Sequence, residues 1–245
     1  MTQLVNLSYI GVGKISGRVA GSATAMRFLG NASAAMLKQE LDEIREPDYT
    51  RVGGGTLQIV RRLKSIKLDL TLMSWIAANY ALAVAGTATA VASATITDEV
   101  VKGYKGGLVR LAAPPGAITT VKNSAGSTTY VAGTDYTMSP AGLMFPTTSA
   151  IVEAADLKVT YVNLAHDRIE AATTTSTTME ICVEGLNEVD SGAPCITDMW
   201  RVSMPPAAEL ALLGDKMGEL KFIAELLADT TKGVGASAFF RSLKT

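Results

Sequence analysis

Between Asp69 and Asp98 the sequence contains no charged residue, and the pattern of this uncharged stretch changes halfway along. Good helix formers run from Trp75 to Ala85 and are followed by Gly86, as at the C-terminal end of a helix. From Thr87 to Thr97, Thr or Ser occupies most alternate positions, with Ala or Ile between them. That spacing is typical of a β-strand. The stretch therefore predicts one short helix followed by strand.

The same stretch is a poor candidate for a membrane span. Its many hydroxyl groups are unfavourable in a bilayer, and no cluster of Lys or Arg flanks it. We also find no basic segment followed by an apolar one at the start of the chain, so no secretory signal is expected. Cys182 and Cys195 are the two cysteines, and we expect both to be reduced. The sequence predicts no membrane insertion.

Composition and motifs give no support for an enzyme. Net charge is −1 over 245 residues, so there is no general basic field to hold nucleic acid. The single histidine, His166, has no second His or nearby Cys with which to build a zinc site. The Gly11–Lys14 segment lacks the earlier glycine and the following Ser or Thr of a phosphate-binding loop. We expect no catalytic residues, no cofactor and no metal.

Two neighbouring segments predict a long hairpin. Residues 34–45 combine helical spacing of Leu and Ile with alternating charges, so on its own this segment is ambiguous between helix and strand. After the loop from Pro47 to Gly55, residues 57–70 have the pattern of a long strand, in which Ile66, Leu68 and Leu70 share one face with Leu72. A register centred on the loop places Glu40 opposite Arg62, and opposite charges facing each other stabilise a strand pair. The strand interpretation of residues 34–45 is therefore favoured.

Residues 98–165 differ from the rest of the sequence in their pattern, because residues typical of turns recur at short and fairly even spacing. Short β runs lie between the turns: Leu108–Leu111, Ile118–Lys122, Thr128–Ala132, Leu143–Phe145 and Leu157–Val162. Such spacing is typical of a small all-β sandwich.

Longer strand patterns return after Thr173 and end before residues 228–245, which are expected to form a loose tail. The predicted organisation is one β domain, residues 1–97 and 166–245, which is split by an inserted domain of residues 98–165.

The order of these features resembles the major tail tube proteins of long-tailed, siphovirus-like bacteriophages over nearly the whole chain. The matching pieces before the insert are Leu29-Gly30-Asn31 ahead of an acidic strand, Gly53-Gly54-Gly55 ahead of a basic strand, Met73-Ser74-Trp75, and Thr95–Glu99. Those after it are Glu184–Asn187, Asp190-Ser191-Gly192, Val202–Pro206, Leu210–Asp215 and Glu225–Asp229. Within the insert, Tyr130–Tyr136 and Val159-Thr160-Tyr161 resemble a β-sandwich segment found in many phage and surface proteins. The resemblance rests on the order of these pieces.

The resemblance implies a mainly β protein: a tail-tube β-sandwich with one flanking α-helix and an inserted immunoglobulin-like β domain that faces outward. It implies a structural subunit that self-assembles into homo-hexameric rings, stacked into the hollow tail tube through which genomic DNA is delivered. The implied partners are the tape measure protein, the tail terminator and distal tail proteins, with double-stranded DNA passing without specific binding. The implied location is the virion tail, after synthesis and assembly in the cytoplasm of the bacterial host.

Three sets of residues are the expected sites. The hairpin loop is expected to contact neighbouring subunits through Pro47, Asp48, Tyr49, Arg51, Gly53, Gly54 and Gly55. Four acids are expected to face the lumen, where a basic wall would hold DNA: Glu40, Asp42, Glu180 and Glu184. The alternative for these acids is an exposed face, or pairing with the nearby basic residues Arg61, Arg62 and Lys64. Contacts of a C-terminal arm are expected at Phe239, Phe240 and Arg241.

A binding module is the alternative function, namely a phage decoration or adhesion protein with an immunoglobulin-like domain. The insert alone would support that function. Self-assembly separates the two hypotheses, because a tube subunit forms rings or filaments unaided, whereas a decoration module stays monomeric without its lattice.

Overall fold

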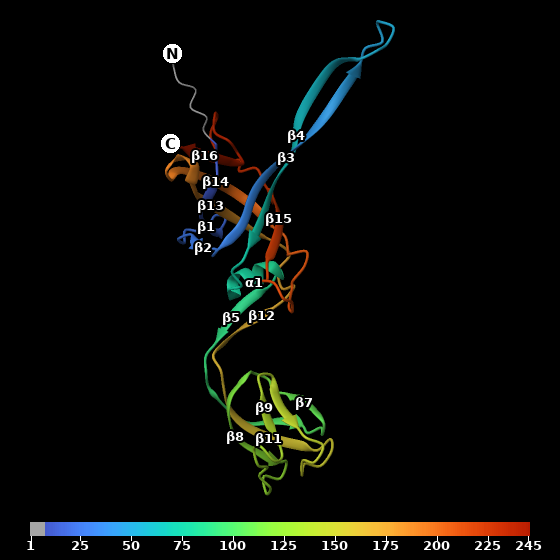
Figure 1. Ribbon diagram of the computed structural model, residues 1–245, viewed down its shortest axis with the longest axis vertical. Coiled ribbons are helices and arrows are strands. Elements are labelled where there is room, and N and C mark those ends of the chain that lie inside the picture. The colour runs from blue at the N-terminus through green and yellow to red at the C-terminus, as the bar shows by residue number, and fades with distance from the viewer. Residues whose placement is uncertain (1–7) are drawn as a thin grey trace. The chain divides into compact units, whose positions relative to one another are not determined.

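The computed structural model describes residues 8–245 and is mainly β, with 54% of residues in strands (Figure 1). It divides into two compact units. The first unit extends to Ala88 and resumes from Ile169 to Thr245, and the second unit is Thr89–Arg168. Each unit has a hydrophobic core of its own.

The first unit contains an eight-stranded sheet. Its strands are β1 (Gly11–Val19), β2 (Arg27–Phe28), β3 (Ala32–Pro47), β4 (Thr56–Leu72), β13 (Thr177–Asn187), β14 (Ala193–Met204), β15 (Leu220–Leu226) and β16 (Phe240–Lys244). The hydrogen-bonded order is β2-β1-β13-β14-β15-β4-β3, with β16 beside β14. A short 3-10 helix, η1 (Glu188–Asp190), lies between β13 and β14. β14 and β15 pair at Val202–Leu226 and Ser203–Glu225, so the path is narrow at its middle.

Alternation along the strands explains the core of this unit. Every second residue is buried on two of the strands. On β4 these are Ile66, Leu68, Leu70 and Leu72, and on β15 they are Leu220, Phe222, Ala224 and Leu226. The same cluster also contains residues from the other half of the path: Ile15, Met179, Ile181, Met199, Val202 and Met204. Side chains from both halves of the sheet therefore pack in a single core, although few strand hydrogen bonds connect the halves.

The predicted hairpin register is wrong. Glu40 lies opposite Ser65, and Arg62 lies opposite Asp42 rather than Glu40. The turn is displaced from the expected centre, since Pro47 pairs with Thr56, and two irregularities shift the register further by leaving Leu57 and Lys64 without partners in the ladder.

The predicted loose tail is also wrong in part. Residues Phe240–Lys244 form β16, which pairs antiparallel with β14 from Cys195 to Met199.

The predicted helix is present but short, as α1 (Ala77–Ala83). Ala85 takes a left-handed conformation with φ 48°, and the Gly86 N–H donates to the Ala81 carbonyl at 2.8 Å. Gly86 is required for a different reason from the one that the sequence indicates. A Cβ at this position would meet the Glu170 carbonyl oxygen at 2.2 Å, so only glycine fits between α1 and that backbone.

The Gly86→Ala variant is expected to lower the free energy of unfolding by about 1–3 kcal/mol. The added Cβ would clash with the Glu170 carbonyl, which is a backbone group and cannot move away as a flexible side chain can. Urea denaturation measures the effect. The control is Gly233→Ala, where a Cβ meets nothing within 4 Å. Equal stabilities of the two variants would contradict this close approach.

The second unit has two three-stranded sheets. One sheet has the order β6-β11-β8 and consists of β6 (Thr95–Lys102), β11 (Asp156–Asn163) and β8 (Pro115–Asn123). The other has the order β7-β10-β9 and consists of β7 (Gly107–Arg110), β10 (Gly142–Phe145) and β9 (Thr137–Ser139). Both contribute to one core, which includes Val121, Leu143, Phe145, Leu157 and Tyr161. A separate two-stranded sheet pairs β5 (Thr87–Val91) with β12 (His166–Glu170).

One predicted strand of the second unit, Thr128–Ala132, is wrong and is replaced by isolated bridges. The buried carboxylate of Asp135 accepts the N–H groups of Val131 at 2.8 Å and Ala150 at 3.1 Å. These two bonds lower the pKa of Asp135. The backbone at Val131 therefore bonds to a side chain instead of continuing a ladder.

Candidate functional site: an exposed hairpin arm

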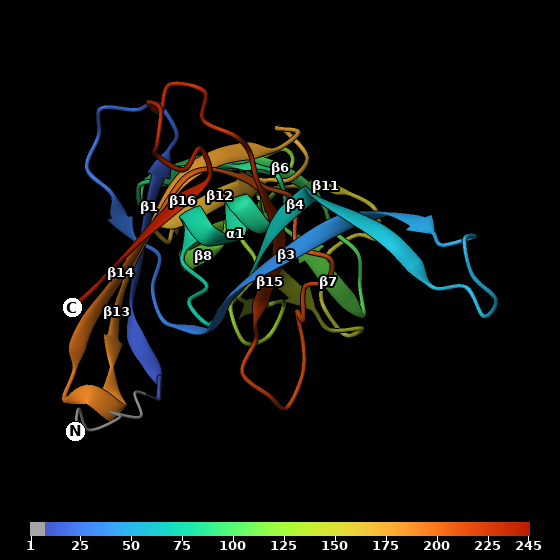
Figure 2. The same cartoon turned by 90° about the horizontal axis from the view of Figure 1, so that it is seen from above.

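The outer part of the β3–β4 hairpin projects away from the rest of the first unit (Figures 1 and 2). We call residues 41–63 the arm. Every residue of the arm except Asp48 is exposed, whereas Ile66 and Leu68 on the same strand are buried. The arm therefore has no core of its own in the monomer.

Large apolar side chains lie on both faces of the arm. Directly paired residues share a face and neighbours along a strand alternate, so the Leu41–Leu63 pair and the Ile44–Val60 pair lie on opposite faces. The exposed fractions are 52% and 44% in the first pair and 51% and 48% in the second. A hairpin that is apolar on both faces is an unusual surface to leave in water.

Polar contacts at Glu43 and Glu40 link the two strands of the hairpin. Arg61 Nε of β4 lies 2.8 Å from Glu43 Oε1 of β3, and Arg45 Nη2, on the same strand as Glu43, lies 2.6 Å from Glu43 Oε2. The Arg61 hydrogen bond and then the Arg45 bond hold the pKa of Glu43 below its usual range. At the base, Lys67 Nζ and Ser65 Oγ donate to Glu40 and lower its pKa in the same way. Because such pairs are exposed, they set alignment more than they set stability.

Asp48 organises the tip of the arm. Its side chain is 3% exposed and accepts hydrogen bonds from Thr50 Oγ1, the Thr50 N–H and Arg51 Nε, at 2.5, 2.9 and 2.7 Å. These contacts, the Thr50 bonds first, lower the pKa of Asp48. The Asp48 N–H also donates to the Gly55 carbonyl at 2.9 Å and closes the loop. The tip is thus an ordered turn.

The Asp48→Ala variant is expected to speed trypsin cleavage after Arg51 by about tenfold, because the loop loses three hydrogen bonds and opens locally more often. The pKa of Asp48 is lowered by folding, so the contact is complete above roughly pH 4 and is lost as the pH falls further. Asp42→Ala is the control, on the same exposed strand. Identical cleavage rates in the two variants would show that Asp48 does not hold the turn.

The seven predicted loop residues all lie at this tip, from Pro47 at the end of β3 to Gly55 just before β4. Gly53, Gly54 and Gly55 have φ values of 98°, 63° and 137°, which favour glycine. Tyr49 is 88% exposed and Val52 is fully exposed, so the turn holds two large apolar side chains out in solvent.

The four predicted lumen acids lie on two separate parts of the sheet. Glu40 and Asp42 are on β3, and Glu180 and Glu184 are on β13, with β14, β15 and β4 between these strands in the path. Glu180 pairs with Arg18 Nε at 2.8 Å, and Glu184 lies opposite Lys14 in the ladder. Basic residues therefore accompany the two acids of β13.

The predicted C-terminal contact residues are used within the chain. Phe239 and Phe240 are half-buried against the core of the first unit. Arg241 Nη2 pairs with Asp198 Oδ2 at 2.8 Å, and its guanidinium lies over the Trp200 ring.

Sequence reasoning missed the apolar faces of the arm. Residues 57–63 mix Leu, Ile and Val with Gln and Arg in no clean alternation. That irregularity is the available signal, because a strand with one buried face shows alternation and this one has none.

Other kinds of site have little support in residues 8–245. No group of three or more His, Cys, Asp or Glu side chains gathers there in an arrangement suited to a metal ion. The side chain of the half-buried His166 makes one hydrogen bond within residues 8–245, between Nδ1 and the Leu164 carbonyl at 2.8 Å. No helix in that part of the chain has the length and apolar character needed to cross a membrane.

The sequence was compared with curated proteins and with protein families. No curated protein matches the sequence. A family described as "Protein of unknown function UCP028589" matches residues 8–243, which is nearly the whole chain. The protein therefore belongs to the UCP028589 family.

Proposed function

We propose that the protein is a structural subunit of a phage tail tube, which assembles into hexameric rings that stack around a channel for DNA. The observation that carries this proposal is the arm, whose two faces both expose paired apolar side chains. An isolated two-stranded ribbon is marginally stable in water. Neighbouring copies of the chain would cover both faces and stabilise it.

The free edge of β3 supports the same proposal. β3 is the last strand of the path and is 16 residues long, so its outer edge is free of strand partners among the described residues. Long unpaired edges invite pairing with another chain, and pairing between identical subunits satisfies them in a closed ring.

In this proposal the first unit is the tail-tube β-sandwich and the second is an immunoglobulin-like module on the outside of the tube. Rings stack through the arm tip, and tape measure, terminator and distal tail proteins complete the structure in the virion. DNA passes through the channel without specific binding.

Assembly of the purified full-length chain tests the proposal. Light scattering after size exclusion and negative-stain microscopy are expected to show rings or tubes. The Leu41→Ser/Leu63→Ser and Ile44→Ser/Val60→Ser variants each remove the apolar pair of one face, and both are expected to weaken assembly. The matched control, Val100→Ser/Val152→Ser, changes two exposed apolar residues of the second unit. A wild-type chain that stays monomeric at high concentration would refute a self-assembling tube.

Removing the second unit separates this function from the adhesion alternative. Replacement of residues 89–168 by a short Gly/Ser linker is expected to leave ring or tube formation intact, because the two cores share no residue. Microscopy and thermal melting of the shortened chain check the result. Loss of assembly by a shortened chain that still folds would place the second unit in the interface.

A further inference from the structure

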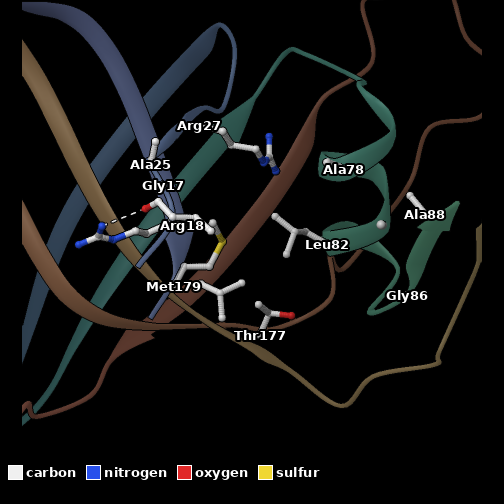
Figure 3. A pocket seen from close by; sticks show the side chains of 13 residues that line it. Gly17, Arg18, Ala25, Arg27, Ala78, Leu82, Gly86, Ala88, Thr177 and Met179 are labelled. Atoms are coloured by element: carbon white, nitrogen blue, oxygen red, sulfur yellow. Dashed lines mark hydrogen bonds between the residues drawn. The ribbon is translucent and has the colours of Figure 1, made fainter. Parts of the chain in front are cut away.

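A cavity of about 380 Å³ lies in the first unit, between β1, β2, β13 and α1 (Figure 3). Its walls are mostly small or apolar and include Ala25, Ala78, Ala81, Leu82 and Met179. Volume and lining are those of a site for a small ligand or a single side chain. It belongs to neither the arm nor its tip.

Arg27 of β2 lies on the wall of this cavity and its side chain runs toward α1 (Figure 3). Its Nη2 donates to Asn79 Oδ1 at 2.9 Å. Asn79 is fully buried, and its Nδ2 donates to the Leu29 and Ser74 carbonyls at 2.6 and 3.0 Å. Those two bonds fix the orientation of the amide, so its oxygen must face Arg27. The guanidinium is therefore held in place.

The charge of Arg27 has no counter-charge in the described part of the chain. No carboxylate there lies within ion-pair distance of Arg27, and its Nη1 is buried without an acceptor. Burial lowers the pKa of the Arg27 guanidinium. Arg18 lines the same cavity and differs, because it pairs with Glu180 at 2.8 Å. Arg27 is half-buried, so water solvates only part of this charge. Because the rest of the guanidinium is desolvated, an anionic partner in the cavity would be favourable.

We propose that this cavity binds a carboxylate carried on a short aliphatic group. A guanidinium is a planar set of N–H donors suited to carboxylate oxygens. In Arg27, Nη2 already donates to Asn79, and Nη1 has no acceptor among the described residues, so Nη1 is the donor that a carboxylate would satisfy. The apolar side chains of Leu82 and Met179 cover the aliphatic part. A free carboxylic acid and an acidic side chain of a neighbouring subunit offer the same chemistry.

Equilibrium dialysis of the full chain with radiolabelled isovalerate tests the site, with the neutral isovaleramide as the matched ligand. Saturable binding at one site per chain is expected, with the amide binding at least tenfold more weakly. Arg27→Met is expected to weaken isovalerate binding at least tenfold, whereas Arg110→Met, at an exposed position of the second unit, leaves it unchanged.

A second variant protects the test against a folding defect. Ala78→Leu fills the cavity and leaves the Arg27–Asn79 contact in place, so it is expected to abolish binding without lowering the melting temperature. Absence of isovalerate binding by the wild type, equal binding of the amide, or full binding by a folded Arg27→Met variant would each overturn the proposal.

The source of the carboxylate follows from dialysis of assembled and unassembled protein. If a neighbouring subunit supplies it, isovalerate binds the free chain, is excluded from the assembly, and Arg27→Met weakens assembly. If a free acid supplies it, binding persists in the assembly and Arg27→Met assembles normally. Binding to the unassembled chain is measured in either case, so failure of the tube proposal leaves this test intact.

Discussion

Replacing residues 41–64 with Asn-Gly is expected to abolish ring and tube formation while the first unit keeps its melting temperature. The closing pair becomes Glu40 and Ser65, which already lie opposite each other, and Asn-Gly is the favoured two-residue hairpin turn. The arm contributes no residue to the core of this unit, so its removal leaves the packing unchanged.

The expected loss is large because the arm holds four exposed apolar residues in two cross-strand pairs, and further ones at its tip. Full burial of one such side chain contributes about 1.5–3 kcal/mol, of which about half is already realised in the monomer. Only part of the remainder appears as affinity, so we expect at least roughly 100-fold weaker association, which corresponds to about 2.8 kcal/mol. Concentration-dependent light scattering measures it. A shortened chain that assembles like the wild type would remove the arm from the interface.

Phe222→Ala is expected to destabilise the first unit by about 3–5 kcal/mol and to leave the second unit unaffected. Phe222 is 1% exposed, and its alternating neighbours on β15 line the same core. The second unit has a separate core around Leu143 and Tyr161, so the two are expected to unfold in separate transitions.

Calorimetry shows which transition moves, and Leu143→Ala serves as the reciprocal variant in the second unit. The side chain of Leu143 is fully buried, which makes the two changes comparable. A single transition shifted equally by both variants would show that the units unfold as one.

Strands with one buried face were predictable from the sequence. Ile66 to Leu72 and Leu220 to Leu226 alternate cleanly, and the structure buries one side of each. The β3 segment was ambiguous because its pattern suits helix and strand alike, and its state is decided by pairing with β4. The register depends on the position of the turn and on the irregularities at Leu57 and Lys64, for which the local sequence has no marker.

The candidate sites were less predictable for a similar reason. Pro47 and the three glycines mark a turn by their own conformational preferences, so the tip was found. Arg27 and Asn79 are 52 positions apart, and neither has a neighbour in sequence that indicates their contact. The pairing of Glu180 with Arg18 across 162 positions is equally hidden. Such sites depend on the strand order, which sequence patterns do not specify.

The narrow middle of the large sheet has a mechanical consequence. β14 and β15 are joined at two residue pairs, and one further backbone bond runs from the Leu227 N–H to the Arg201 carbonyl at 2.8 Å. Arg201 Nη1 adds a side-chain hydrogen bond to the Ala228 carbonyl at 3.3 Å, and the two halves share one hydrophobic core. A change in the angle between the halves therefore strains few hydrogen bonds. In the proposed tube, such subunits would allow bending by small adjustments inside each copy, without opening the contacts between copies.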